Sequence, residues 1–250
     1  MLSILNVNSL VHWEEREILR REAFVRHFSE EVRAFLRSVN PAWDMRRVEA
    51  PTLIPRHLIS DAYGNADVWV QQQLAPTETE LVLRPETTPS TYAYMTHLLD
   101  THTGARLPLC VWQAGRSYRR EQEQTTAHMR LKEFWQMEFQ AAFTADTGMD
   151  YHAACLEPVR KMIASVIALP TRIVPSDRLP SYSEVTMDVE VDNGFKWMEV
   201  CSISRRTDFP RKFVSRAKGG ALREHDVLVL EIAIGLDRCL HNWAIAADRA

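Results

Sequence analysis

The sequence has few residues of the types that break regular structure. It contains 8 glycines and 12 prolines among 250 residues, which argues against long disordered or low-complexity stretches. It also has only four cysteines, Cys110, Cys155, Cys201 and Cys239, which lie far apart and form no CxxC pair. That spacing argues against a structural zinc site and against a disulfide framework, so we expect no zinc and a reducing, cytoplasmic location.

Long apolar runs and a strong charge of one sign are also missing. No apolar stretch approaches the roughly 20 residues that a membrane span requires, and Met1 to Leu10 has no signal-peptide pattern. The formal net charge of −3 gives no general attraction to nucleic acid, so any RNA contact would need a local basic patch. We expect a soluble protein without a membrane partner.

Two phosphate-binding motifs are absent as well. The sequence contains neither GxxxxGK[ST] nor GxGxxG, which excludes the P-loop and the dinucleotide-binding fingerprint. In those folds, backbone amides at a helix start bind the phosphates. An ATP site in this chain would therefore depend on side chains for much of its phosphate binding.

The hydrophobic pattern indicates a mixed fold. Apolar residues recur at three- and four-residue steps from Glu14 to Ser38 and predict a long amphipathic helix that ends at Asn40-Pro41. Later segments predict strands over residues 46–53, 80–83, 108–118, 132–143, 183–191, 195–204 and 225–234, and helices over 150–169 and 236–247. Because consecutive strands have short connections, we expect an α+β fold with an antiparallel β-sheet of about six strands flanked by helices.

The first candidate site is a pair of strands joined by a charged loop. Arg119 and Glu121 alternate, so they face the same side of one strand, and Phe134 lies on the returning strand. An arginine offers paired donors to phosphate oxygens, and an aromatic ring can cover a purine. The segment is a plausible nucleotide cradle, although by itself it also suits an exposed hairpin with Phe134 in the core.

Two further segments carry charges where strands end. Glu231 and Ala233 share one face of a strand, Gly235 permits a sharp exit, and Arg238 falls in the first turn of the last helix, where it could reach a polyphosphate. Glu86 follows Pro85 at another strand exit. Alone, the first segment also suits a helix-start charge pair, and the second a surface turn.

The order of these segments resembles the catalytic core of the class II aminoacyl-tRNA synthetases. The long first helix and the strand ending at Pro51 look like the family's first motif, 118–121 with Phe134 like the second, and 235–238 like the third. Within the class, the glycyl-tRNA synthetases are most similar. The matching stretches are LRPET at 83–87, RLKEFWQME at 130–138, WMEV at 197–200 and RTDF at 206–209.

The resemblance implies ATP-dependent activation of a small amino acid, preferably glycine, with ATP and Mg²⁺ as cofactors. Arg119 would hold the α-phosphate and the substrate carboxylate, and Arg238 the far phosphates; these two arginines are the implied catalytic residues. Glu121 would accept from the adenine amino group, while Phe134 would stack on adenine. Glu231 would act on magnesium or on the substrate ammonium.

The same resemblance implies a substrate-binding set. Glu86 and Glu138 would grip the ammonium group, and Arg206 and Glu199 would line the same pocket. Two positions depart from the family pattern, because Gln140 replaces an expected carboxylate and Ala233 an expected serine. A third departure replaces the usual Gln and Gly after RPET by Thr88-Pro89-Ser90. Such changes alter amino-acid selection more than ATP binding. Glycine is therefore the preferred substrate among several small amino acids.

Length sets the last expectation. Residues 1–250 predict one catalytic domain, with an N-terminal helical segment at 1–40, the core at 46–242 and no anticodon-binding domain. Three functions remain open: charging of a tRNA acceptor end, transfer of the activated amino acid to another acceptor such as a carrier protein, or a non-catalytic accessory role. We also expect a homodimer through the first helix and the Pro51 strand.

Overall fold

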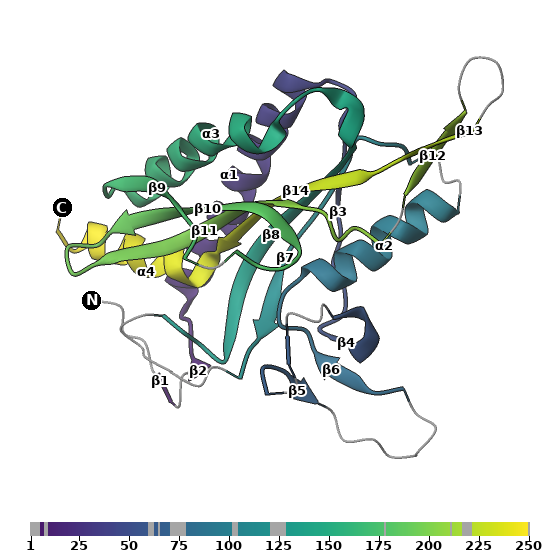
Figure 1. Cartoon of the computed structure of the whole chain (residues 1–250). Coiled ribbons are helices and arrows are strands. Elements are labelled where there is room, and N and C mark those ends of the chain that lie inside the picture. Colours follow the sequence, from purple (N-terminus) through teal and green to yellow (C-terminus); the bar gives the residue numbers. More distant parts are fainter. Residues whose placement is uncertain are drawn as a thin grey trace.

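A twisted seven-stranded sheet forms the centre of the computed structural model, which describes residues 6–7, 10–59, 63–64, 66–70, 79–101, 105–120, 129–177, 179–210, 212–216 and 222–249 (Figure 1). The strand order is β3-β7-β8-β14-β11-β10-β9. The β3–β7 pair is parallel, and the other neighbouring pairs are antiparallel. The bounds are β3 Asp44–Arg47, β7 Leu109–Tyr118, β8 Glu133–Thr144, β9 Thr171–Pro175, β10 Ser183–Asp192, β11 Trp197–Arg206 and β14 Val227–Gly235. The expected α+β fold with an antiparallel sheet flanked by helices is confirmed, with β9 as a strand that the sequence pattern did not predict.

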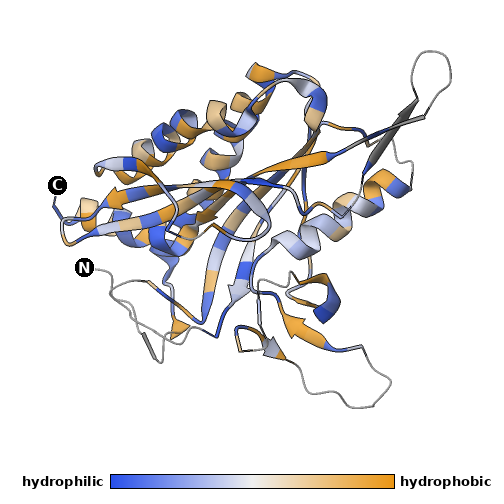
Figure 2. Ribbon diagram, viewed as in Figure 1, coloured by the Kyte–Doolittle hydropathy of each residue, from blue (hydrophilic) through white to orange (hydrophobic). Residues whose placement is uncertain are grey.

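Three helices cover one face of this sheet: α1 (Glu15–Val39), α3 (Tyr151–Ile167) and α4 (Leu236–Ala247). Alternation along β14 separates the two faces, because Leu230 and Ile232 join the helix-side core while Glu231 and Ala233 line a cavity. Phe24 and Phe28 of α1 are buried in that core. The alternation of hydrophilic and hydrophobic residues along the strands can be followed in Figure 2. Hydrophobic burial on one face thus directs the polar residues of the other face toward the site.

Helix α2 (Thr88–Asp100) lies beside the opposite face, next to a small sheet of β4 (Leu53–Pro55), β6 (Leu81–Leu83) and β5 (Trp69–Val70) in the order β4-β6-β5. Met95 and Leu98 of α2 pack against Leu109, Val111 and Val229 of the main sheet. The sequence pattern does not indicate this helix, since its first turn contains threonines and a proline. Proline is nevertheless well suited to a first helical turn, where its missing N–H costs no hydrogen bond.

The strand expected over residues 46–53 is wrong in its extent. The chain pairs with β7 only as far as Arg47 and joins the small sheet from Leu53. Between them the buried Arg84 donates from Nη1 to the carbonyls of Ala50 and Pro51, at 3.1 and 3.3 Å. This arginine satisfies the backbone carbonyls of a connection that crosses between two sheets, so the segment needs no ladder partner there.

The remaining elements are short. Two hairpins pair β1 (Asn6–Val7) with β2 (Leu10–Val11), and β12 (Phe213–Arg216) with β13 (Leu222–His225). Single 3₁₀ turns occupy Arg56–Leu58 and Ala145–Thr147. Within the described part of the chain, no helix has both the length and the apolar character that crossing a membrane requires.

Candidate active site

The polar face of the main sheet forms the floor of a cavity of about 1130 Å³. Its position follows from strand register, because Glu231 of β14 lies opposite Gln140 of β8, and Ala233 lies opposite Glu138. Antiparallel neighbours that face the same side bring their side chains within contact distance. Charged residues from separate segments of the sequence therefore meet above the centre of the sheet.

One part of the cavity carries the residues expected to hold a nucleotide. Arg119, Phe134 and Arg238 all line it. The Arg119 guanidinium lies 5.3 Å from the Phe134 ring centroid, and its Nε donates to the Pro85 carbonyl at 3.0 Å. The structure thus brings the two arginines and the phenylalanine to one cavity, as an ATP site requires. Glu121, the expected adenine contact, lies outside the described residues.

Arg238 also contacts an expected substrate residue. Its Nη1 donates to the Glu199 carbonyl at 3.0 Å and lies 3.3 Å from the Glu199 carboxylate. Glu199 lines the cavity, but its charged partner is the arginine at the start of α4. The position of Glu199 therefore favours a role beside Arg238, the arginine expected to bind the far phosphates, over direct contact with the amino acid.

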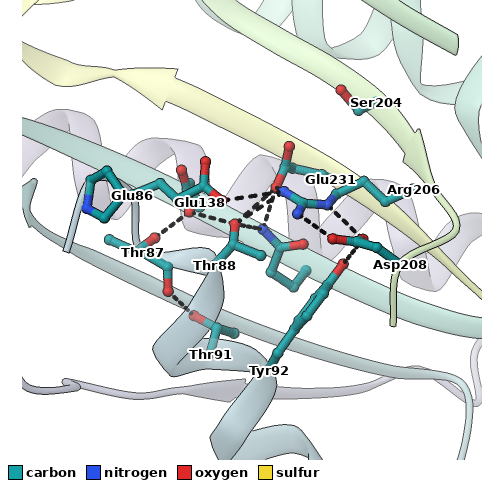
Figure 3. Close-up of polar contacts among 12 residues, drawn as sticks. Glu86, Thr87, Thr88, Thr91, Tyr92, Glu138, Ser204, Arg206, Asp208 and Glu231 are labelled. Atoms are coloured by element: carbon teal, nitrogen blue, oxygen red, sulfur yellow. Dashed lines mark hydrogen bonds and ion pairs between the residues drawn. The ribbon is translucent and has the colours of Figure 1, made fainter. Parts of the chain in front are cut away.

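Three glutamates form the other part of the site around a buried arginine (Figure 3). Arg206 donates from Nη1 to Glu231 at 2.7 Å, and the same nitrogen lies 3.7 Å from Glu86. Glu138 is linked to Glu231 through Thr88, whose hydroxyl lies 3.1 Å from the first carboxylate and 2.9 Å from the second. The carboxylates expected to bind an ammonium group thus come from the segment after β6 (Glu86), from β8 (Glu138) and from β14 (Glu231).

Burial shapes the charge of this group. Removal from water, together with the neighbouring Glu231 and Glu86 carboxylates, raises the pKa of Glu138 to about 8. Burial likewise raises the pKa of Glu86, against the opposing effect of Arg206. The Glu86 Oε1 atom is buried without a hydrogen-bond partner. A cationic ligand placed among these carboxylates would supply the missing partner and favour their ionised forms.

Two predicted pocket residues lie behind the cavity wall. Gln140 and Arg206 are 0% and 1% exposed and do not line the cavity. The Gln140 amide donates to Glu231 at 2.7 Å. Arg206 donates to the Asp208 carboxylate from Nε at 3.0 Å and from Nη2 at 2.7 Å. Both residues therefore fix the orientation of Glu231 instead of meeting a substrate directly.

Several contacts were not predicted from the sequence. Thr87, at the start of α2, donates to Glu138, and the hydroxyl of the next residue, Thr88, lies 3.1 Å from the same carboxylate. The Tyr182 ring covers the Arg206 guanidinium, 3.8 Å from its centroid, and the Tyr63 hydroxyl donates to Glu86 at 2.8 Å. These residues lie in loops or at a helix start, where no periodic pattern indicates direction. Of these residues, only Thr87 belongs to a segment, RPET, that resembles the glycyl-tRNA synthetases.

The surroundings of Glu231 do not fit the expected magnesium role. Its Oε2 accepts from Arg206 at 2.7 Å, from Gln140 at 2.7 Å and from Thr88 at 2.9 Å. Magnesium prefers a shell made of oxygen ligands, and a guanidinium in contact with the same carboxylate repels a second cation. Among the described residues, no group of three or more His, Cys, Asp and Glu side chains could hold a metal ion.

Comparisons with known proteins agree with the geometry. The sequence model for the tRNA synthetase class II core domain (G, H, P, S and T) matches residues 69–244. The glycine–tRNA ligase of Mycolicibacterium paratuberculosis is 27% identical over 199 residues, which cover 72% of this chain and 43% of that protein. The glycine–tRNA ligase of Cutibacterium acnes is 29% identical over 211 residues, 74% of this chain and 44% of that protein. The chain thus spans less than half the length of these curated relatives.

A solved structure supports the fold over nearly the whole chain. Prolyl-tRNA synthetase from Cryptosporidium parvum, complexed with halofuginone and AMPPNP, superposes with a TM-score of 0.75 at 13% sequence identity. The match covers 97% of this chain and 49% of that one. The resemblance expected from the sequence motifs is therefore confirmed: the chain belongs to the class II tRNA synthetase core family.

Proposed function

We propose that this protein uses ATP to adenylate a small amino acid. The observation that carries the proposal is a single cavity lined by Arg119, Phe134 and Arg238 together with Glu86 and Glu138. The first three provide two cations and an aromatic face, which suit a triphosphate and a purine. The glutamates provide the anionic surroundings that an ammonium group needs. One cavity thus offers complementary chemistry to both substrates.

The reaction needs alignment more than proton transfer. The substrate carboxylate is already ionised near neutral pH, so it can attack the α-phosphorus without a general base. A bond forms between a carboxylate oxygen and phosphorus, and the bond to the bridging oxygen breaks, releasing pyrophosphate. Arg119 would stabilise charge on the α-phosphate while Arg238 holds the far phosphates. Magnesium would arrive with the triphosphate that it accompanies, and no step here depends on an ion held by Glu231.

Glycine is our preferred substrate. The support is the naming of the relatives as glycine–tRNA ligases and the presence of Glu86 and Glu138 in the cavity as ammonium partners. Gln140 and Ala233 remove one carboxylate and one hydroxyl from the pattern expected for that family. Because such groups discriminate through hydrogen bonds, a panel of small amino acids must accompany glycine in any assay.

The acceptor is a separate part of the proposal. We propose transfer either to a tRNA acceptor end or to another acceptor such as a carrier-protein thiol, by a cytoplasmic enzyme that works as a homodimer through α1 and the segment that ends at Pro51. The four cysteines are free and buried, which suits a reducing compartment. An accessory, non-catalytic role is the competing function, and the convergence of both arginines on one cavity argues against it.

Amino-acid-dependent exchange of labelled pyrophosphate into ATP tests the activation step. We expect exchange with glycine or another small amino acid, and silence with every amino acid would favour the accessory role. A second assay compares label transfer from the activated amino acid to total tRNA and to purified carrier proteins. Labelled tRNA would eliminate a role restricted to carrier proteins, whereas label on carrier protein alone would eliminate tRNA charging.

A further inference from the structure

Tyr63 connects the two halves of the site through one hydroxyl group. Its Oη donates to Glu86 Oε2 at 2.8 Å and accepts from Arg119 Nη2 at 3.1 Å. The direction of both hydrogen bonds is fixed, because a guanidinium can only donate. The single tyrosine proton must therefore point to the glutamate, which has to present an acceptor oxygen.

The backbone around Tyr63 is held in place on several sides. Its carbonyl accepts from Arg56 Nη2 at 2.9 Å. The following turn is closed by the Asp67 carboxylate, which accepts from the Gly64 amide at 2.8 Å, and the Asp67 carbonyl accepts from the Arg120 amide at 3.1 Å. This last bond ties the turn to the residue next to Arg119. The backbone at Arg120 therefore helps to position Tyr63, whose hydroxyl contacts the neighbouring Arg119.

The ring of Tyr63 supports the same arrangement. It packs against the small apolar cluster that contains Ile54, Val68 and Val82, and the Arg119 guanidinium lies 5.6 Å from its centroid. Packing on one side and a cation on the other leave the hydroxyl little freedom to leave Glu86. A side chain held in this way restricts the orientation of the charged groups to which it is hydrogen-bonded.

We propose that Tyr63 is a positioning residue that locks the Glu86 carboxylate and the Arg119 guanidinium into one relative orientation, so that the ammonium and carboxylate ends of one amino acid are bound together. The inference rests on the proposed function, since it assigns those two ends to Glu86 and Arg119. With Oε2 occupied by the tyrosine, Glu86 keeps Oε1, which lacks a hydrogen-bond partner, for the ammonium group. Two Arg119 nitrogens are held by Tyr63 and by Pro85, which fixes the plane of the guanidinium.

The electrostatic surroundings give the proposal a pH signature. Glu86 faces Arg206 of β11, Glu231 of β14, Arg119 beyond β7 and the nearby Glu138 of β8. Burial raises the Glu86 pKa, and the arginines and the Tyr63 hydroxyl lower it. Removing the hydroxyl withdraws a donor from the ionised carboxylate, so the pKa must rise further. Amino-acid binding that needs ionised Glu86 would then be lost at a higher pH than in the wild type.

The test is Tyr63→Phe, which keeps the ring and removes only the hydroxyl. In pyrophosphate exchange we expect KM for the amino acid to rise roughly tenfold or more, because the lost bond joins charged groups, while KM for ATP changes much less. The acid limb of 1/KM for the amino acid should move to higher pH. The matched control is Tyr94→Phe, which removes a hydroxyl that bonds Arg46 and lies outside the cavity.

The outcomes separate this inference from the proposed function. An active wild type with an unchanged KM and acid limb in Tyr63→Phe overturns the positioning role and leaves the proposed function intact. A wild type that is silent with every amino acid overturns both. Incomplete folding of the variant cannot imitate the expected result, since it lowers the concentration of active enzyme and so kcat, but not KM or its pH dependence.

Discussion

The Glu231 carboxylate lies 2.7 Å from Arg206 Nη1 at a place where 7% of the glutamate side chain and 1% of the arginine side chain is exposed. Asp208 holds the opposite edge of the same guanidinium through two hydrogen bonds. The arginine is therefore fixed on both sides and holds Glu231 at the cavity floor. Because it is a buried cation in contact with two carboxylates, removing its charge would leave both of them buried without a partner.

Replacing Arg206 by methionine should strongly destabilise the fold. The change leaves Glu231 and Asp208 without their cation in a buried site, and breaking such a pair costs about 3–5 kcal/mol. The free energy of unfolding in urea measures the effect. Arg205→Ala, next to Arg206 on β11, removes a partly exposed arginine that pairs with Glu184 and Asp150, and should cost less than about 1 kcal/mol. Equal losses for the two variants would contradict the assignment.

Arg119→Ala should abolish most of the activation reaction. The guanidinium is the cation expected at the α-phosphate, and losing one such donor reduces turnover by at least about a hundredfold. Pyrophosphate exchange under saturating ATP measures the change. Arg116→Ala is the control, because Arg116 is about half exposed, pairs with Glu133 and does not line the cavity. Turnover that is retained in Arg119→Ala would remove this residue from the site.

Glu138→Gln should change how stability depends on pH. The folded-state pKa of Glu138 is about 8, above its ordinary value of 4.5, so the folded protein holds a proton that the unfolded chain has released. The stabilisation that this proton gives the folded state is fully present below the ordinary pKa of 4.5. It is lost as pH rises through the folded-state pKa of about 8. Wild-type stability should therefore fall relative to Glu138→Gln between about pH 5 and pH 8, by about 3 kcal/mol. Parallel urea titrations across this range measure the difference, with the surface variant Glu133→Gln as control. A wild-type–variant difference that is independent of pH would show that Glu138 does not titrate there.

Strand periodicity in the sequence was enough to predict much of the sheet. Strands over 108–118 and 132–143 correspond to β7 and β8, and the last helix begins and ends at Leu236 and Ala247 as expected. Alternation then indicated which residues share a face, and this is why Glu231 and Ala233 could be assigned to one side. These features depend on residues that are close together in the sequence, so they can be predicted from the sequence alone.

Contacts between distant segments could not be read in the same way. Asp237 was recognised as part of a helix start, yet its carboxylate accepts from the Trp135 amide, 102 residues earlier, at 2.9 Å. Tyr63 lies in a loop without periodicity, and its two partners are 23 and 56 residues away. Glu199 was expected beside the amino acid but pairs with Arg238. Such pairings depend on strand order and on loop paths, which local patterns leave undetermined.

Gln140→Glu should destabilise the protein although it restores the carboxylate expected for glycyl-tRNA synthetases. The Gln140 amide donates to Glu231 and to Thr88 at 2.7 and 2.8 Å, and a glutamate there sets two buried carboxylates against each other. Gln140→Met removes the donors without adding charge and should cost about 1–3 kcal/mol. We expect Gln140→Glu to be less stable than Gln140→Met, with a gap that widens as pH rises because repulsion requires both groups to ionise. Urea unfolding of both variants at two pH values decides the point, and a Gln140→Glu protein as stable as the wild type would refute it.

Phe134→Leu should weaken ATP binding while leaving amino-acid binding nearly unchanged. Phe134 packs on the apolar cluster of Met129, Leu131 and Met198, so leucine retains an apolar contact with that cluster but loses the aromatic face available to adenine. Base–aromatic stacking contributes about 1–3 kcal/mol, which corresponds to a rise in KM for ATP of roughly tenfold or more. Steady-state exchange with each substrate varied in turn separates the two constants. Phe195→Ala is the matched control, because Phe195 is 85% exposed between β10 and β11 and lies outside the cavity. A KM for ATP that stays the same in Phe134→Leu, or that rises equally in both variants, would place adenine elsewhere than on Phe134.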